Sequence, residues 1–573
     1  MSDTLASALV RAARVRGRGL RFWDRSEQET RLDWADVLDR AARVAGGLRE
    51  RGIRPGDTVA LVFPTGPAFF DGFFGAVLAG AVPVPLYPPV RLGRLDEYHA
   101  RTAAMLGAVQ ARMVLCEART WRVLGVSVAA ARPPLGAVDI ADVRGPAHVA
   151  EGSPEDLAFV QFSSGTTVDP KPVALSHGAV IANVRAILSL IIRSDADQDG
   201  VSWLPLYHDM GLVGCVFTAL LRGGNLTLLA PEQFLARPAS WLRAISRTRS
   251  LISPAPNFAY ALCVDRIADA DLDGVDLSSW RYALNGAEPV SPATLRRFVD
   301  RFARWGLRRE ALTPVYGLAE ASLAVTFSAV DEPFSSRRFD RTALSEGRVL
   351  EAVDGVELVS VGRPLPETRV EAPVDRIGPV RVSGPGLMTG YLHQPERTAA
   401  VYAGGCLDTG DLGFLHEGEL FLTGRARDLI ILRGRNHSPH EIEQAVDAVP
   451  GVRTGCAAAV SWRPEAAEHE QLVVFVEVRS DGSGGLPEAA PDSGIAEMCA
   501  KAILAATGLD PTLVVPLAPG SLPRTSSGKI RRGEALRRWV AGELSPPDAV
   551  NAWTLAGALA KGTLAHWRSS FGR

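Results

Sequence analysis

Apolar and polar positions follow two different periods along roughly the first 424 residues. Short and nearly continuous apolar runs, such as LAFVQF at 157–162, are typical of strands that are buried on both faces. Longer stretches with helical periodicity lie between these runs, for example at 34–51 and 292–305. Strands that alternate with helices predict an α/β fold with doubly wound layers.

The size and composition of the chain set further limits. A chain of 573 residues is too long for one compact core, so we expect two or more domains. A formal net charge of −2 provides no electrostatic reason for a nucleic-acid or anionic-membrane partner. The apolar run at 180–192 is interrupted by Arg185 and is too short to span a bilayer.

Cysteine and lysine usage add two observations. The six cysteines form no C-x-x-C pair, and the N-terminus has no apolar core of signal-peptide length, which together favour a cytoplasmic location. Only four of the 62 Lys+Arg residues are lysines, namely Lys171, Lys501, Lys529 and Lys561. Because a compact ammonium and a planar guanidinium do different chemistry, a retained lysine marks a candidate site. Lys171 and Lys529 lie inside motifs, whereas the other two do not.

The first motif is a turn rich in Ser, Thr and Gly that follows the predicted strand at 157–162. Ser176 then has the position of a helix N-cap. Hydroxyls and backbone N–H groups around Gly165 can point into one concavity, which suits phosphate oxygens, and Lys171 would add positive charge. It is not a Walker A loop, and alone it is equally compatible with an ordinary surface turn.

This turn resembles the phosphate-binding motif of the adenylate-forming superfamily, [ST]-S-G-[ST]-T-G-x-P-K-G. Val168 and Pro172 replace the two later glycines of that motif. Because Pro172 has no N–H and Val168 does not easily adopt positive φ, we expect fewer backbone donors to phosphate. The matching residues are Ser163, Ser164, Gly165, Thr166, Thr167, Pro170 and Lys171.

Four further segments follow in the order of that superfamily: RYALNGAEP (281–289), TPVYGLAEAS (313–322), CLDTGDLGFLHEGELFLTGRARD (406–428) and SLPRTSSGKIRR (521–532). Singly, they are compatible with a β-turn, a core tyrosine, a turn aspartate and a solvated basic loop. Their common order favours the superfamily over these alternatives.

The resemblance implies a role for each matching residue. Thr166 and Glu320 would hold Mg²⁺, and Lys529 would neutralise charge between the substrate carboxylate and the α-phosphate of ATP. Asp411 would accept hydrogen bonds from the ribose in a glycine-flanked turn, and Asp428 would be the hinge of a mobile C-terminal domain. The other implied nucleotide-binding residues are Ser163, Ser164, Gly165, Thr167, Lys171, Asn285, Gly286, Ala287, Glu288, Tyr316, Gly317 and Arg425.

Several segments are more similar to the fatty acyl-AMP ligases than to the acyl-CoA ligases. They include WLPLYHDMGLVG (203–214), ILRGRNHSPHEIE (431–443) and an insertion-like stretch between Phe327 and Gly362. In that group the insertion restrains the C-terminal domain, and the acyl-adenylate passes to the phosphopantetheine of an acyl carrier protein. The alternatives are a ligase that uses free CoA and a non-catalytic adenylate-binding relative.

The same resemblance places His208 near the substrate carboxylate and the mouth of an acyl channel, as a catalytic group. A lone histidine in an apolar-aromatic setting is otherwise a satisfied core residue. Phe258 and Tyr260 are candidates for the wall of the acyl channel, and core packing explains them equally well.

The resemblance also implies the architecture. We expect a large N-terminal AMP-binding domain at 1–426 with two doubly wound sheets and a distorted β-barrel. A small α+β lid at 427–544 and a tail of unknown role at 545–573 would follow. The expected activity is ATP- and Mg²⁺-dependent conversion of a carboxylic acid, most simply a fatty acid, to acyl-AMP with release of pyrophosphate.

Overall fold

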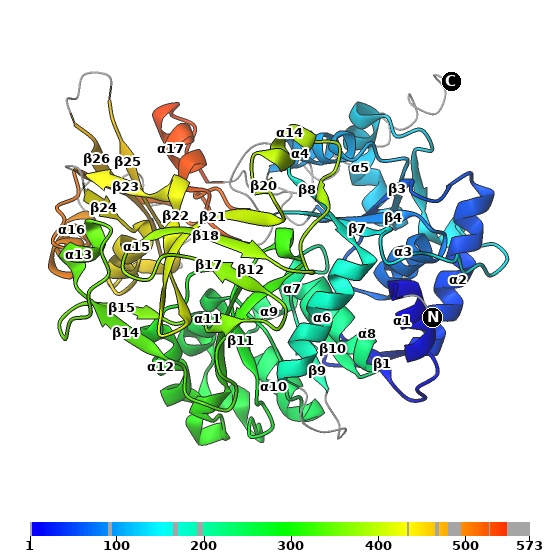
Figure 1. Ribbon diagram of the computed structural model, residues 1–573, viewed down its shortest axis with the longest axis horizontal. Coiled ribbons are helices and arrows are strands. Elements are labelled where there is room, and N and C mark those ends of the chain that lie inside the picture. Colours follow the sequence, from blue (N-terminus) through cyan, green and yellow to red (C-terminus); the bar gives the residue numbers. More distant parts are fainter. Residues whose placement is uncertain are drawn as a thin grey trace.

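The computed structural model describes residues 3–89, 94–163, 170–191, 199–432, 435–464, 469–479, 494–525 and 528–546 (Figure 1). Within these ranges, no helix is both long enough and apolar enough to cross a membrane. The tail expected from residue 545 lies outside the described residues apart from its first two positions.

The first sheet is entirely parallel, with strand order β4–β3–β5–β6. Parallel neighbours need crossover connections, and α3, α4 and α5 supply them. The sheet β19–β8–β7 continues this layer, since β7 packs beside β4. The elements are α2 (Trp34–Glu50), β3 (Thr58–Val62), α3 (Pro67–Leu78), β4 (Val82–Leu86), α4 (Leu95–Ala108), β5 (Met113–Cys116), α5 (Ala118–Ala131), β6 (Ala137–Asp139), β7 (Leu157–Phe162), β8 (Pro172–Ser176) and β19 (Gly390–Tyr391).

The second layer joins two four-stranded sheets, β2–β1–β10–β9 and β11–β12–β13–β16. Ile252 connects them, because it forms parallel bridges with both Gly200 and Tyr282. The strands are β1 (Gly19–Trp23), β2 (Glu29–Asp33), β9 (Gly200–Ser202), β10 (Leu226–Leu229), β11 (Ala283–Asn285), β12 (Leu312–Gly317), β13 (Ala324–Phe327) and β16 (Arg363–Pro364).

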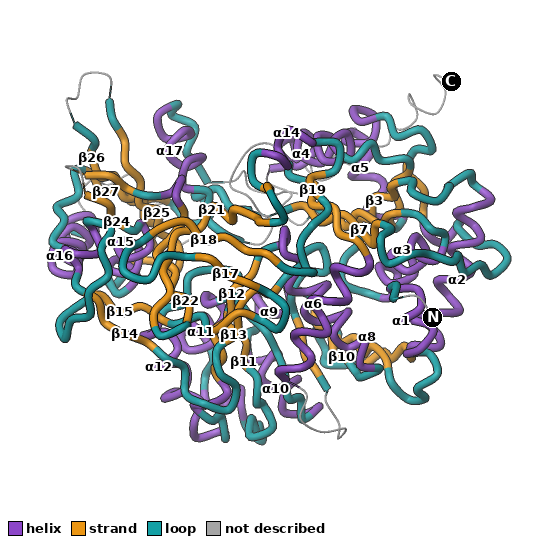
Figure 2. Tube along the Cα trace, in the orientation of Figure 1, coloured by secondary structure: helices purple, strands orange, loops and turns teal. Residues whose placement is uncertain are grey.

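Helices lie around and between these two layers (Figure 2). They are α1 (Leu5–Ala12), α6 (His177–Ile191), α7 (Asp209–Gly211), a π-helix (Leu212–Phe217), α8 (Thr218–Arg222), α9 (Pro231–Ala236), α10 (Ala239–Thr248), α11 (Asn257–Arg266), α12 (Pro292–Phe302) and α14 (Pro395–Ala399). The predicted doubly wound α/β architecture is confirmed.

The local predictions agree closely with the observed elements. The run at 157–162 is β7, and the Ser176 hydroxyl accepts a hydrogen bond from the Ala179 amide at 3.2 Å, as an N-cap does. The stretch at 292–305 is helical only to Phe302. A 3₁₀ turn (Ala303–Trp305) follows and ends at Gly306, whose φ of +88° favours glycine.

The predicted distorted barrel is a five-stranded antiparallel half-barrel. Its strands are β17 (Arg369–Glu371), β18 (Gly378–Ser383), β20 (Tyr402–Ala403), β21 (Cys406–His416) and β22 (Glu419–Arg425). The insertion-like stretch folds against it as β14 (Ser336–Phe339), α13 (Arg341–Ser345) and β15 (Val356–Val359). The ring of Phe339 anchors this stretch, with its centroid 5.0 Å from that of Phe414 and 5.5 Å from that of Phe421.

The C-terminal residues form a separate α+β unit at the opposite side of the molecule from the N-terminus (Figure 1). Two hydrophobic clusters lie within it, and both consist only of residues between 430 and 544. The elements are β23 (Ile430–Leu432), β24 (Arg435–His437), α15 (Pro439–Asp447), β25 (Val452–Trp462), β26 (Gln471–Val478), α16 (Ile495–Thr507), β27 (Leu513–Leu517) and α17 (Arg532–Val540).

Trp241 on α10 is a central residue of the N-terminal core. It is fully buried, and its Nε1 donates to the Ser253 hydroxyl at 2.8 Å. Burying a ring of this size and pairing its polar atom both stabilise the folded state. The edges and faces of four aromatic rings contact it, namely Trp203, Phe234, Tyr260 and Trp280.

We therefore expect Trp241→Ala to lower the free energy of unfolding by about 3–5 kcal/mol, because it leaves a cavity in the aromatic cluster. Leu235 on the neighbouring α9 is 46% exposed, so Leu235→Ala should change stability by no more than about 0.5 kcal/mol. Urea unfolding followed by tryptophan fluorescence measures both changes. Equal shifts for the two variants would contradict the assigned packing.

Candidate active site

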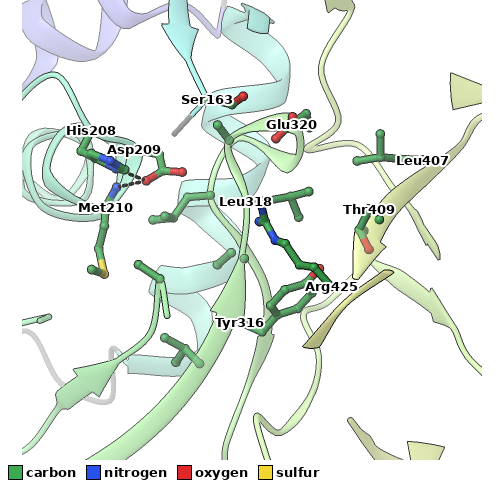
Figure 3. A pocket seen from close by; sticks show the side chains of 18 of the residues that line it. Ser163, His208, Asp209, Met210, Tyr316, Leu318, Glu320, Leu407, Thr409 and Arg425 are labelled. Carbon is green, nitrogen blue, oxygen red and sulfur yellow. Dashed lines mark hydrogen bonds and ion pairs between the residues drawn. The ribbon is translucent and has the colours of Figure 1, made fainter. Parts of the chain in front are cut away.

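One cavity of about 310 Å³ lies where both layers, the half-barrel and the C-terminal unit meet. Part of its lining is apolar, and part carries charged or hydrogen-bonding groups (Figure 3). The polar part includes Ser163, Lys171, His208, Asp209, Tyr316, Glu320, Tyr391, Thr409, Arg425, Arg427 and Lys529.

A close approach of two strands shapes one wall. β11 pairs in parallel with β12 and ends at Asn285, which is fully buried. A Cβ on the next residue, Gly286, would lie 2.8 Å from Cγ2 and 2.9 Å from the carbonyl oxygen of Val315, so only glycine fits there. Ala287 follows with a φ of +68° and lines the cavity. This geometry leaves room for a flat ring beside the backbone.

Tyr316, Asp411 and Arg425 form a network that links β12 to β21 and β22. The Tyr316 hydroxyl donates to Oδ2 of Asp411 at 2.6 Å, and Nε of Arg425 donates to Oδ1 at 3.0 Å. Burial, together with the Asp411 charge, raises the pKa of Tyr316 well above its usual value, so the phenol remains a donor. Each Asp411 oxygen still has a second lone pair for a ligand hydroxyl.

Asp411 was expected in a turn, and the structure places it inside the long strand β21. Gly410, with a φ of +71°, bends that strand immediately before it. The Gly410 amide donates to Asp408 and the Asp411 amide to the Thr409 hydroxyl, which satisfies the backbone at the irregularity. The bend thus places Asp408, Thr409 and Gly410 on the lining of the cavity.

A cation and a carboxylate share the part of the cavity that contains Ser163, the first residue of the segment that resembles the phosphate-binding motif (residues 163–172, here called the phosphate loop). Nζ of Lys171 lies 5.3 Å from the ring centroid of Tyr391, whose hydroxyl donates to Oε1 of Glu320 at 2.9 Å. Burial lowers the pKa of Lys171, and the Glu320 charge partly opposes that shift. Of the loop itself, Ser163 lines the cavity, whereas Ser164, Gly165, Thr166 and Thr167 lie outside the described residues.

His208 is oriented by its neighbour Asp209. Nδ1 of His208 lies 3.0 Å from Oδ1 of Asp209, which also accepts from the Met210 amide at 2.7 Å. Burial opposes ionisation of Asp209, but the bond to His208 and the charges of His208 and Lys529 lower its pKa below the usual value. The pairing directs the other ring nitrogen of His208 away from Asp209.

Lys529 is the residue of the C-terminal unit that lines the cavity. Its loop is closed by hydrogen bonds, from the Thr525 amide to the Lys529 carbonyl at 2.8 Å and from Arg524 Nη1 to the Gly528 carbonyl at 2.7 Å. Gly528 has a φ of +90°, which favours glycine. Burial and the nearby Arg425 lower the pKa of Lys529, while Asp209, Glu288 and Asp411 oppose the shift.

The structure decides between the two alternatives left open for Phe258 and Tyr260. Tyr260 is fully buried in the aromatic core, where its hydroxyl donates to the Leu284 carbonyl at 3.0 Å. Phe258 packs against Trp203, and neither Tyr260 nor Phe258 lines the cavity. The core-packing alternative therefore holds for both. The apolar lining comes instead from Ile187, Met210, Gly214, Leu284, Val315, Leu323, Ala324 and Phe327.

Five other expected site residues are described but are not part of the lining: Asn285, Gly286, Glu288, Asp411 and Asp428. The Glu288 carboxylate accepts from the Phe258 amide at 2.5 Å, and burial raises the pKa of Glu288. The hinge candidate Asp428, in the 3₁₀ turn Ala426–Asp428, accepts from Arg532 Nη1 at 3.4 Å. Nine expected residues do line the cavity: Ser163, Lys171, His208, Ala287, Tyr316, Gly317, Glu320, Arg425 and Lys529.

Sequence reasoning did not single out five polar residues of the lining, Asp209, Tyr391, Asp408, Thr409 and Arg427. Four of them lie within the motif segments 203–214 and 406–428, so membership of a motif was the available signal. Tyr391 had no such signal, because it follows Lys171 by 220 positions and reaches it only through the pairing of β19 with β8.

Comparisons with known sequences and structures provide independent information on the family. Residues 10–392 match the family model described as AMP-binding enzyme. Long-chain-fatty-acid–AMP ligase FadD23 of Mycobacterium tuberculosis (strain CDC 1551 / Oshkosh) is 34% identical, over 90% of this chain and 92% of the relative. The 4-hydroxyphenylalkanoate adenylyltransferase of Mycobacterium marinum is 36% identical, over 89% and 86%.

The fold comparison gives the same grouping. A solved structure of a fatty acyl-adenylate ligase, from a study of these enzymes in E. coli and L. pneumophila, superposes with a TM-score of 0.87 at 33% identity, covering 94% of this chain and 98% of the other. The chain therefore belongs to the AMP-binding enzyme family, in the group that contains the fatty-acid–AMP ligases.

Proposed function

We propose that this protein is a ligase that joins a fatty acid to the AMP part of ATP, with release of pyrophosphate. It then passes the acyl group to the phosphopantetheine thiol of an acyl carrier protein, with release of AMP. One observation carries the proposal. A single cavity combines an apolar lining for an acyl chain, a network for a nucleoside, and Lys529 from the C-terminal unit. The fatty-acid–AMP ligase among the relatives supports the choice of acid.

The nucleoside would bind against the wall formed by Ala287 and Tyr316. The Tyr316 ring offers a stacking face while its hydroxyl remains bonded to Asp411. Asp411 would accept hydrogen bonds from the ribose, and Arg425, held by Asp411, would contact the ribose and the α-phosphate. The wall and the network would thus fix the adenosine before any chemistry takes place.

The reaction is a displacement at the α-phosphorus. A carboxylate oxygen of the acid forms the new bond to phosphorus, and the bond to the pyrophosphate oxygen breaks. The protein contributes positioning and charge stabilisation, with Lys529 neutralising charge between the carboxylate and the α-phosphate. His208, oriented by Asp209, would lie beside the carboxylate at the mouth of the apolar part.

The residues fit a magnesium ion bound together with ATP. No cluster of three or more potential metal ligands occurs among the described residues, so an ion held by the protein alone is not supported there. Mg²⁺ is usually bound by one or two carboxylates plus substrate phosphates, and Glu320 provides one carboxylate on the lining. When bound, the ion would neutralise phosphate charge, with Glu320 and Thr166 as its protein ligands.

We divide the chain into an N-terminal domain (1–426) and a lid (427–544) that rotates about Asp428. The lid's hydrophobic clusters contain no residue of the N-terminal domain, which supports rigid-body movement. A few polar contacts connect the two parts. Glu97 of α4 pairs with Arg538 of α17 at 2.9 Å, and Arg341 in the insertion pairs with Glu441 of the lid. Rotation would withdraw Lys529 and admit the carrier thiol.

We place the reaction in the cytoplasm, without a nucleic-acid partner. All six cysteines are free thiols, as expected in a reducing compartment. The net charge of −2 offers no general attraction for a polyanion.

Lys529→Ala should lower the rate of acid-dependent pyrophosphate release by about 10²–10³-fold, because it removes a fixed positive charge at the reacting phosphate. Lys501 is a matched control, since it lies on the lid surface in an ion pair with Glu497. Lys501→Ala should retain the full rate. Similar losses in both variants would remove Lys529 from its assigned role.

The acceptor can be identified by following pyrophosphate and acyl products with MgATP and a panel of acids. Reactions without an acceptor and reactions with CoA should both yield acyl-AMP. Reactions with a phosphopantetheinylated carrier protein should yield the acylated carrier. Efficient acyl-CoA formation would assign the chain to the CoA ligases. Absence of adenylate from every acid would mean a non-catalytic relative.

Gly214→Leu should raise the KM for long-chain acids at least tenfold and leave the KM for ATP unchanged. A Cβ at Gly214 would already lie 2.8 Å from Cδ2 of Leu323, so a larger side chain must fill the apolar part of the cavity. Gly107→Leu on the exposed face of α4 is the control. An unchanged profile of KM against acid chain length would show that the acyl chain binds elsewhere.

A further inference from the structure

The part of the cavity that contains Lys171 and Glu320 depends on a residue with no assigned role. Tyr391 belongs to β19, a strand of only two residues. It is 5% exposed, and it contacts both of these charged side chains. The three residues come from distant parts of the chain, so their relative position requires a specific backbone connection.

Backbone hydrogen bonds on both sides of Tyr391 provide that connection. On one side, the Leu392 amide donates to the Pro172 carbonyl at 2.8 Å, next to Lys171. On the other, the Met388 amide donates to the Glu320 carbonyl at 2.9 Å. The strand is therefore attached both to the exit of the phosphate loop and to the turn that carries Glu320.

The two side-chain contacts of Tyr391 differ in chemistry. Its hydroxyl donates to Oε1 of Glu320 at 2.9 Å, which restricts the carboxylate and leaves Oε2 for a cation. Its ring lies 5.3 Å from Nζ of Lys171, a cation–π distance that favours the ammonium in this position. One side chain thus holds an anionic group and a cationic group of the same cavity.

The phosphate loop has Pro172 where the superfamily motif has glycine, and this increases the need for well-placed charged side chains in phosphate binding. Pro172 has no N–H to donate to a phosphate oxygen, so charged side chains must supply more of the binding. The ammonium of Lys171 can act only if it is held near the phosphates, since its long chain is otherwise free to rotate.

We propose that Tyr391 is a positioning residue for MgATP, which holds Glu320 toward the metal through its hydroxyl and Lys171 toward the phosphates through its ring. This inference rests on the proposed function, because it assumes that the cavity binds ATP. It assigns the metal-dependent part of ATP binding to the hydroxyl and a metal-independent part to the ring.

Binding of ATP without any acid tests this inference, because no turnover occurs. Calorimetric titration of the full chain in Mg²⁺ and in EDTA gives two Kd values for each variant. Their ratio, the magnesium enhancement, is measured within one variant and does not depend on that variant's own stability. Thermal unfolding of each variant confirms that it is folded.

Tyr391→Phe should reduce the magnesium enhancement about tenfold and leave the Kd in EDTA within twofold of wild type, because only the bond to a charged carboxylate is lost. Tyr391→Leu should also weaken ATP binding in EDTA, since the ring beneath Lys171 is removed. Tyr98→Phe is the control: Tyr98 is also buried, donates to the Tyr87 carbonyl, and lies outside the cavity lining. It should leave both Kd values unchanged.

A double-mutant cycle separates positioning from a general structural effect. If Tyr391 acts through Glu320, Tyr391→Phe should have no further effect in a Glu320→Gln background. Additive effects, or an enhancement in Tyr391→Phe within twofold of wild type, would overturn the inference while leaving the proposed function intact. Absence of ATP binding by the wild-type chain in either buffer would overturn both.

Discussion

The contact on which the site most depends is the buried network of Tyr316, Asp411 and Arg425. It joins a strand of the second layer to two strands of the half-barrel, over a distance of about a hundred residues in sequence. Because Asp411 is buried, it needs both donors, and each donor lines the cavity. The network therefore fixes the angle between two parts of the N-terminal domain and, with it, the wall of the proposed adenosine site.

Lys529 is held in the cavity in a different way from the Tyr316, Asp411 and Arg425 network. It lines the same cavity, but it belongs to a unit with its own hydrophobic clusters. That unit is connected to the N-terminal domain mainly through polar contacts such as Glu97–Arg538 and Arg341–Glu441. Partly exposed ion pairs contribute little to stability, so this interface would suit the proposed lid movement after adenylation. A rigid wall and a weakly attached lid together provide the two functions that the proposed reaction needs.

Motif-based predictions succeeded where a residue acts through its immediate neighbours. The strand at 157–162 and the Ser176 cap follow from local periodicity and hydrogen bonding, and nine residues predicted from motifs line the cavity. The sequence left the outcome open where packing decided it. Phe258 and Tyr260 were compatible with both a channel wall and the core, and the structure packs them in the aromatic core. Asp411 lies in a bent strand rather than a turn, since β18 and β22 pair on either side of it.

By itself, the sequence determined the doubly wound class, the order of the motifs and the chemical identity of the charged groups, because periodicity, glycine positions and a scarcity of lysine are local properties. Only the tertiary structure decided which groups face one another. Tyr391 meets Lys171 and Glu320 because a two-residue strand pairs with β8, and Asp209 and Lys529 line one cavity because the C-terminal unit packs beside it. Such contacts depend on strand pairing and domain packing between distant segments, and neither leaves a periodic pattern in the chain.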